Sequence, residues 1–169
     1  PQKNSIEISN AAGLNKNGEI PPQTLKYLGF DRVVIGTVTN EPYTTNQESK
    51  SIRYPPTESL LNWMGLPNKG SKIVAERLKN YKNHKIPLTI SIMSTPGKKE
   101  DDILYDLKET ILAFRDIPQV DRFELNLSCP NIKENHNSQL ENIITIIGEN
   151  THSHQKLYLK VSPDVYRYE

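Results

Sequence analysis

Short apolar runs alternate with amphipathic segments along the whole chain, and this alternation restricts the possible folds more than any other feature. The apolar runs are as short as strands, while the segments between them repeat their apolar residues at helical spacing. Strands are expected at 6–9, at 33–35, at 87–93, from 123 and at 157–161, and helices at 21–28, 73–81, 103–114 and 140–147. Strict alternation of the two predicts parallel strands joined by right-handed crossovers.

Two α/β architectures fit this order, an open doubly wound sheet and a (β/α)8 TIM barrel. A complete barrel takes about 250 residues. The 169 residues would then be the N-terminal part of a single barrel domain, 1–169, with roughly its first five strands and four helices. Neither a Gly-x-Gly-x-x-Gly fingerprint nor a P-loop is present. Residues 40–59, rich in Pro, Asn, Thr and Ser, are expected to form a long irregular excursion after the second strand.

Composition argues against several classes of function. The 21 basic and 20 acidic residues nearly cancel, so no basic surface suggests a nucleic-acid partner. A single cysteine cannot form an internal disulfide, which favours a reducing compartment and a cytoplasmic location. No apolar run approaches the roughly 20 residues of a membrane-spanning helix. The histidines lie in polar surroundings, and no metal site is expected.

Polar and small residues collect at the carboxyl ends of the predicted strands, where α/β folds bind their ligands. The set holds two amines, three amides, one thiol and a single notable carboxylate, that of Glu19. Its other members are Ala11, Ala12, Gly13 and Lys16 after the first strand, Gly36, Thr37, Thr39 and Asn62 after the second, Ser91 in the third, Asn126, Ser128, Cys129 and Asn131 after the fourth, and Lys160 in the fifth.

Three of these residues carry the chemical argument. Lys160 lies in an apolar strand, where an ammonium group is costly without an anionic partner, so it is expected to point into a ligand site. Asn126, between two leucines, needs hydrogen-bond partners if it faces a barrel interior. Cys129 is either a small buried apolar residue or a base or nucleophile beside a ligand. Without metal ligands or a carboxylate pair, the set suits a planar anionic ligand and proton abstraction or redox work with an organic cofactor.

Five blocks of the sequence form a pattern together. They are Ala-Ala-Gly-Leu-Asn-Lys-Asn-Gly-Glu at 11–19, Ile-Gly-Thr-Val-Thr at 35–39, Asn-Trp-Met-Gly-Leu-Pro-Asn at 62–68, Leu-Asn-Leu-Ser-Cys-Pro-Asn at 125–131 and Leu-Lys-Val-Ser-Pro-Asp at 159–164. In this order they resemble the successive signatures of the dihydroorotate dehydrogenase family. The resemblance implies an FMN-containing (β/α)8 barrel that oxidises dihydroorotate to orotate in pyrimidine (UMP) biosynthesis.

The resemblance also implies roles for individual residues. Cys129 would be the base that takes a proton from C5 of dihydroorotate, while the hydride at C6 would pass to FMN. The residues implied in substrate binding are Lys16, Asn62, Met64, Gly65, Leu66, Asn126 and Asn131, and those implied in FMN binding are Ala11, Ala12, Gly13, Thr37, Asn126 and Lys160. The family's loops for the flavin phosphate follow strands seven and eight, so this segment by itself is expected neither to bind FMN tightly nor to turn over.

The blocks combine features of two classes of the family. Cys129 and the block at 62–68 resemble the cytosolic class with a cysteine base, whereas the first loop with Lys16 resembles the membrane-associated class. Ser91 stands where that second class has a flavin-binding asparagine. The electron acceptor is left open among quinone, fumarate and NAD, as are homodimer assembly and a peripheral place on the inner membrane through an N-terminal anchor. The alternatives are a flavin barrel similar to dihydropyrimidine dehydrogenase or tRNA-dihydrouridine synthase, and a non-catalytic barrel fragment.

Overall fold

The computed structural model describes residues 6–44, 51–81, 85–99, 101–127 and 140–161. Within them, four strands form one parallel sheet in the order β1-β4-β5-β6, with a helix between each strand of the sheet and the next. The strands are β1 (Val33–Val38), β4 (Leu88–Ile92), β5 (Val120–Asn126) and β6 (Lys156–Lys160), and the helices are α1 (Pro22–Tyr27), α2 (Ser71–Asn80), α3 (Asp101–Phe114) and α4 (Leu140–Asn150). The predicted alternation and parallel sheet are confirmed, and they are those of part of a (β/α)8 barrel.

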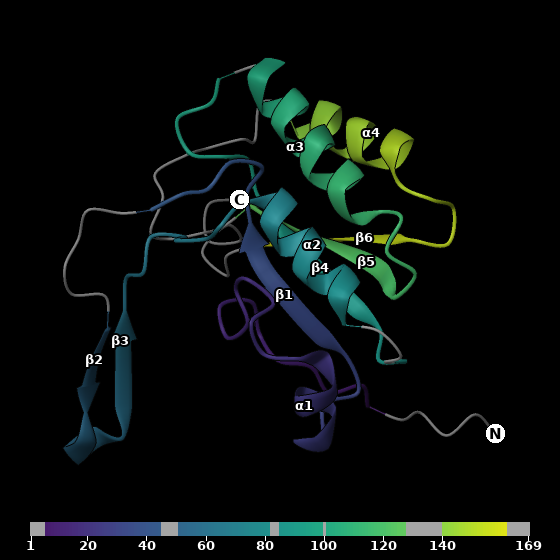
Figure 1. Cartoon of the computed structure of the whole chain (residues 1–169). Helices are drawn as coiled ribbons and strands as arrows, with labels where there is room; N and C mark the ends of the chain where they lie inside the picture. The colour runs from purple at the N-terminus through teal and green to yellow at the C-terminus, as the bar shows by residue number, and fades with distance from the viewer. Residues whose placement is uncertain (1–5, 45–50, 82–84, 100, 128–139, 162–169) are drawn as a thin grey trace.

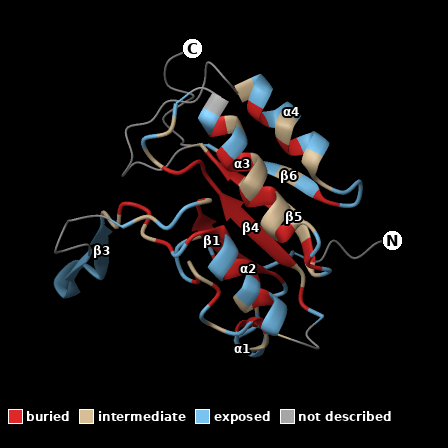
Figure 2. Cartoon of the chain, turned by 45° about the horizontal axis from the view of Figure 1, so that its top comes forward, coloured by how far each residue is buried: buried red, intermediate tan, exposed pale blue. Residues whose placement is uncertain are grey.

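One face of the sheet is apolar and covered by helices. Ile35, Ile90 and Phe123 lie in register on neighbouring strands and are fully buried. Helices α2, α3 and α4 lie over this face (Figure 1), and the buried residues concentrate in β1 and β4 (Figure 2). Burial of a side chain of this size stabilises the fold by about 1.5–3 kcal/mol. The layer between this face and the helices is therefore the hydrophobic core.

The opposite face of the sheet is polar. Ser91 pairs in register with Glu124, and Asn126 with Lys160. Because successive side chains of a strand point to opposite faces, Glu124 and Asn126 share this face while Phe123 joins the core. We call it the polar face, and it carries Thr89, Ser91, Arg122, Glu124, Asn126 and Lys160.

Helix boundaries follow local signals with one exception. Pro22 occupies the first turn of α1, where a helix needs no backbone N–H. The last helix, expected at 140–147, continues through Gly148 to Asn150 as α4. A Cβ added at Gly148 would meet nothing within 4 Å. This glycine costs the helix about 1 kcal/mol relative to alanine, which burial of Ile143 and Ile147 offsets.

The strand expected at 6–9 is reduced to a single bridge. Ser9 pairs in parallel with Arg32, and the backbone N–H groups of Asp31 and Arg32 both donate to the Ile8 carbonyl. Ile6 and Ile8 are 86% and 53% exposed. Without an apolar layer to cover these side chains, the segment gains little from a longer ladder. The strand prediction is therefore wrong for residues 6–8.

The irregular excursion predicted at 40–59 contains a β-hairpin. Its elements are β2 (Ser51–Tyr54), the short 3-10 helix η1 (Pro55–Thr57) and β3 (Ser59–Asn62). The two strands pair antiparallel, with Ile52 opposite Leu61, and Glu58 turns the chain back at a left-handed φ of 50°. Both strands are exposed and project away from the sheet (Figure 1). The irregular prediction fails here because an apolar cross-strand pair and a tight turn align two exposed strands.

A neck closes this excursion at its base. Tyr43 and Asn68 exchange both backbone hydrogen bonds, at 3.0 and 2.9 Å. The buried Asn68 side chain also accepts from the backbone N–H groups of Thr39, at 3.2 Å, and Gly70, at 2.9 Å. The chain therefore leaves the sheet and returns to it at one fixed point.

Candidate functional site

The first loop is fastened along β1. The Gly13 N–H donates to the Gly36 carbonyl at 2.7 Å. The buried Asn10 amide exchanges hydrogen bonds with the backbone N–H and carbonyl of Val34, at 2.9 and 2.8 Å. The predicted flavin-binding segment 11–13 therefore lies against the end of β1.

Gly36 allows β1 and β4 to approach closely. Its φ is +121°, and an added Cβ would lie 2.4 Å from the Ser91 carbonyl oxygen. Only glycine combines this backbone angle with this contact. The Gly36–Thr37 peptide bond is cis. The hydroxyl of the next residue, Thr37, lies 3.0 Å from that of Ser91.

A chain of hydrogen bonds crosses the polar face. Nδ2 of Asn126 donates to Oγ1 of Thr37 at 3.0 Å, and Thr37 contacts Ser91. Oγ of Ser91 donates to Oε1 of Glu124 at 2.8 Å. Nζ of Lys160 lies 3.4 Å from the same carboxylate oxygen. We call these residues on four neighbouring strands the polar chain.

The anionic partner of Lys160 was not predicted from the sequence. It is Glu124, whose side chain is 21% exposed, against 40% for that of Lys160. Glu19, the carboxylate singled out from the sequence, is instead exposed and lies 3.4 Å from Arg77. The signal for Glu124 is its place two residues before Asn126, which puts both side chains on one face of a strand.

Two residues predicted to bind substrate lie together. Nζ of Lys16 is 3.2 Å from Sδ of Met64, a weak contact that joins the first loop to the segment after the hairpin. Gly65 and Leu66 follow, both buried and each with a φ of 63°. Asn62 is exposed at the end of β3.

Part of the predicted site falls outside the described residues. Ser128, Cys129 and Asn131 belong to that part, so the base and one substrate contact stay predictions. Strand β5, which precedes them, ends at Asn126, a residue of the polar chain.

Asp106 on α3 holds the loop that follows β4. Its carboxylate accepts the Thr95 backbone N–H at 2.7 Å and the Thr95 hydroxyl at 2.9 Å. Oγ1 of Thr95 in turn accepts the Glu41 backbone N–H at 3.2 Å. Burial raises the pKa of Asp106 above its ordinary value, although the Thr95 donors act in the opposite direction. One buried carboxyl group therefore fixes the segments that follow both β1 and β4.

A cluster of ion pairs occupies the opposite end of the polar face. Arg32 is 4% exposed and contacts Glu7 at 3.0 Å and both carboxylate oxygens of Asp121. Arg122 also contacts Glu7 and lies over the Tyr158 ring. Burial acts to raise the pKa of Glu7 and Asp121, but the arginines outweigh it, and both pKa values lie below their ordinary range. In parallel barrels this end of the strands serves stability.

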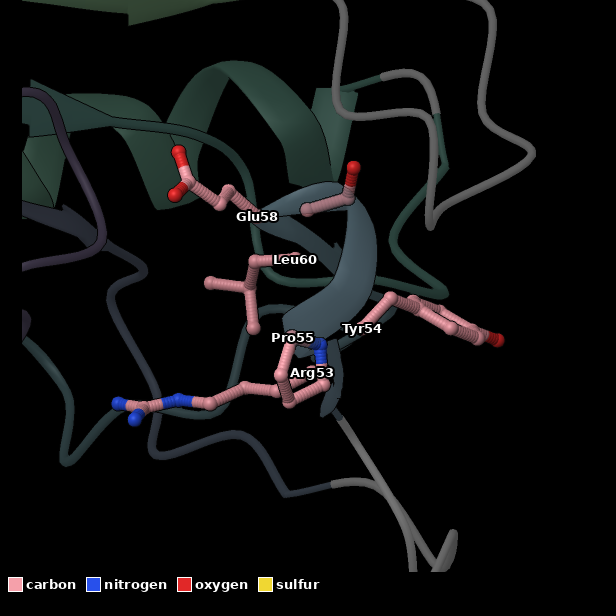
Figure 3. Close-up of a pocket in the computed structure, with 6 residues that line it drawn as sticks. Arg53, Tyr54, Pro55, Glu58 and Leu60 are labelled. Carbon is pink, nitrogen blue, oxygen red and sulfur yellow. The ribbon is translucent and has the colours of Figure 1, made fainter.

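One hollow lies on the polar face and another lies on the hairpin. One, of about 170 Å³, lies on the polar face between the ion cluster and Glu124. The other, of about 320 Å³, lies on the hairpin, where Arg53, Glu58 and Leu60 extend to one side and Tyr54 to the other (Figure 3). None of the predicted site residues lines the hairpin hollow, and all of its lining residues are exposed. We therefore assign it no chemistry.

The described ranges contain neither a metal-binding cluster nor a membrane-spanning helix. Among these residues, no three or more His, Cys, Asp or Glu side chains are grouped so that they could hold a metal ion. No helix in the described part of the chain has the length and apolar character to cross a membrane.

Comparison with known proteins identifies the family. The family model for dihydroorotate dehydrogenase matches residues 3–169. The chain belongs to the dihydroorotate dehydrogenase family. It is 34% identical over 162 residues to dihydroorotate dehydrogenase (quinone) of Natronomonas pharaonis, a match that covers 94% of this chain and 45% of that protein. It is 30% identical over 159 residues to the protein of the same name in a Nitratiruptor species, covering 92% of this chain and 44% of that protein.

Two solved structures agree with the fold of this chain. The Eimeria tenella DHODH in complex with ferulenol has a TM-score of 0.75 at 23% identity, over 92% of this chain and 49% of that one. The ligand-free type from the same species gives 0.74 at 22% identity, over 94% and 50%. At this identity the likeness shows the fold alone. The chain spans about half the length of the curated relatives it matches.

Proposed function

We propose that the protein to which this segment belongs oxidises dihydroorotate to orotate in pyrimidine biosynthesis, with FMN as its cofactor. The polar chain carries this proposal. It gathers an amide, two hydroxyl groups and a cation that is paired with a carboxylate. The amide, the hydroxyl groups and the cation suit a planar, anionic, hydrogen-bonding ligand. Family membership supports this reaction rather than that of the other flavin barrels or a non-catalytic fragment.

The donor set fits a flavin ring. Gly13 has a φ of +107° and nothing within 4 Å of the place a Cβ would take, so a flat ring can approach the backbone of 11–13. The residues that would hold FMN are Ala11, Ala12, Gly13, Thr37, Asn126 and Lys160. When bound, FMN supplies the acceptor for a hydride. The Lys160 ammonium group would then stabilise negative charge on the ring.

The substrate contacts follow the same assignment. The Lys16 ammonium would pair with the substrate carboxylate, a charge-assisted contact. The other residues assigned to the substrate are Asn62, Met64, Gly65, Leu66, Asn126 and Asn131. Cys129 would take the proton from C5 as the hydride leaves C6, so that the C5–C6 bond becomes double. The sulfur then holds the proton until solvent removes it.

Quinone is the electron acceptor that we favour, because both curated relatives described above carry it in their names. Fumarate and NAD are the alternatives. The location that we propose is cytoplasmic, which the single cysteine supports. Peripheral attachment to the inner membrane is its alternative, and homodimer assembly is a further expectation of the family resemblance.

The decisive experiment assays the purified full-length protein with dihydroorotate and each of a short-chain quinone, fumarate and NAD. Quinone-dependent orotate formation is the expected result. Cys129→Ala should lower kcat by about 10²–10⁴-fold, the contribution of a general base, whereas Cys129→Ser should keep part of the activity. A rate unchanged in Cys129→Ala would contradict the base assignment. Absence of orotate formation with every acceptor would contradict the proposed function itself.

A further inference from the structure

The polar chain ends on a group that can only accept hydrogen bonds. The Glu124 carboxylate has no hydrogen to give, and it forms an ion pair with Lys160. The 2.8 Å contact between Ser91 and Glu124 therefore uses the hydroxyl hydrogen of Ser91. A serine has a single such hydrogen, so Ser91 has none left to give to Thr37.

The donors of the next two contacts are fixed in the same way. The 3.0 Å contact between the hydroxyls of Ser91 and Thr37 needs the Thr37 hydrogen, since that of Ser91 is engaged. Thr37 must then receive a hydrogen from Asn126, at 3.0 Å. Only Nδ2 of the amide can give one. The donor direction therefore runs from Asn126 through Thr37 and Ser91 to Glu124, and Oδ1 of Asn126 turns away from Thr37.

We propose that Glu124 is a positioning residue that sets the orientation of the Asn126 amide. The carboxylate acts through two hydroxyl groups, Ser91 and Thr37, rather than by contact with the ligand. With the amide held in this way, a ligand that meets Oδ1 must bring an N–H or O–H donor. The inference rests on the proposed function, in which Asn126 contacts a substrate with ring N–H groups.

Two substitutions remove the orientation in different ways. Glu124→Gln replaces an obligate acceptor by a group that can donate or accept, so the chain can run in either direction. Ser91→Ala leaves the ion pair of Glu124 and Lys160 in place and interrupts the chain at its middle. Because Ser91→Ala removes a single oxygen, it tests the inference even if Glu124→Gln does not fold.

The readout is the equilibrium dissociation constant of orotate for the full-length, FMN-loaded protein, followed by the change in flavin absorbance. Glu124→Gln and Ser91→Ala should each raise this constant about five- to tenfold, the loss of one well-oriented hydrogen bond. Glu7→Gln is the matched control, since Glu7 is also paired with arginines but at the opposite end of the polar face. It should leave the constant within about twofold.

A double-mutant cycle separates positioning from a direct charge effect. In an Asn126→Ala background there is no amide to orient, so neither Glu124→Gln nor Ser91→Ala should weaken orotate binding further. An unchanged constant in both single variants, or an effect that persists without Asn126, would overturn the inference while leaving the proposed function intact. A parent protein that binds neither FMN nor orotate would overturn both.

Discussion

At each end of the strands, a cation on the polar side of the sheet is paired with carboxylates. Arg32 is held between Glu7 and Asp121 where the strands begin, and Lys160 lies beside Glu124 where they end. The two pairs differ in burial, since the side chain of Arg32 is 5% exposed and that of Lys160 is 40% exposed. A buried cation that loses its partners is costly. The Arg32 contacts therefore stabilise the fold, whereas the Lys160 side chain is accessible to a ligand.

The ion cluster predicts a loss of stability in acid. The pKa values of Glu7 and Asp121 lie below their ordinary values of 4.5 and 3.8, so in acid the unfolded chain binds more protons than the folded one. Their contribution is complete above the ordinary values and is lost as the pH falls through the folded values. Arg32→Met should lower the free energy of unfolding at pH 7 by about 2 kcal/mol and flatten the acid slope. Urea unfolding of the full-length protein between about pH 3 and 7 measures both effects.

Arg53→Met is the matched control, because Arg53 is exposed on the hairpin. It should change the free energy of unfolding by less than about 0.5 kcal/mol. If the free energy of unfolding falls as steeply with pH in Arg32→Met as in the parent, the ion cluster is not the source of the acid dependence.

Asp106 affects stability in the opposite sense, since burial raises its pKa. Its contribution is most favourable at low pH and declines as the pH rises through the folded value.

At the scale of elements, the approach of β1 to β4 depends on one glycine. We expect Gly36→Ala to destabilise the protein by at least about 3 kcal/mol, because the new Cβ would lie 2.4 Å from a backbone oxygen at a φ of +121°. Gly148→Ala on α4 is the contrasting change. Its Cβ would meet nothing within 4 Å, and it should stabilise the helix by about 0.5–1 kcal/mol. Thermal unfolding should show a melting temperature below that of the parent for Gly36→Ala and above it for Gly148→Ala. Equal shifts in the two variants would contradict this difference between the two glycines.

The elements that bury apolar side chains were predictable from the sequence, as was β6, which has no buried residue, but the exposed hairpin was not. Runs such as 33–35 and 87–93 indicate buried strands because transfer of their apolar side chains out of water is favourable. The hairpin has only exposed residues and so leaves no periodic signal. The strand at 6–9 failed for the opposite reason, since its isoleucines are apolar yet uncovered.

The candidate site was predictable where a residue type is chemically out of place. Lys160 and Asn126 stand out within apolar strands, and the structure joins both to the polar chain. Glu124 did not stand out, because its role depends on register with Ser91 on the neighbouring strand. Cross-strand register is set by the packing of the whole sheet and cannot be read from one strand alone.

The molecule as a whole combines a two-faced sheet with an exposed hairpin. Its core lies on one side of the sheet, under α2, α3 and α4, and its charged and hydrogen-bonding groups lie on the other (Figure 1). The hairpin of β2 and β3 contributes none of the residues of that core. Stability is therefore distributed unevenly along the chain.

Hydrogen exchange should reveal this unevenness. We expect the backbone amides of β1 and β4 to exchange slowest among the described strands, because these strands are buried throughout. The amides of β2 and β3 should exchange through local opening, many times faster, because both strands are exposed. Mass spectrometry of the full-length protein after timed labelling measures the difference. Protection of the hairpin equal to that of β4 would show that the hairpin is packed against another surface.

The neck at Tyr43 and Asn68 has a consequence for how relatives can diverge. A loop whose ends are already joined can change length at little expense, since each doubling of a flexible loop adds only about 0.6 kcal/mol to the entropy of closure. Met64, which contacts Lys16, lies inside the joined segment, whereas the polar chain lies outside it. Insertions and deletions can therefore reshape the contacts near Lys16 while the hydrogen bonds across the four strands stay the same. The neck therefore separates changes of length in the hairpin from the hydrogen bonds of the polar chain.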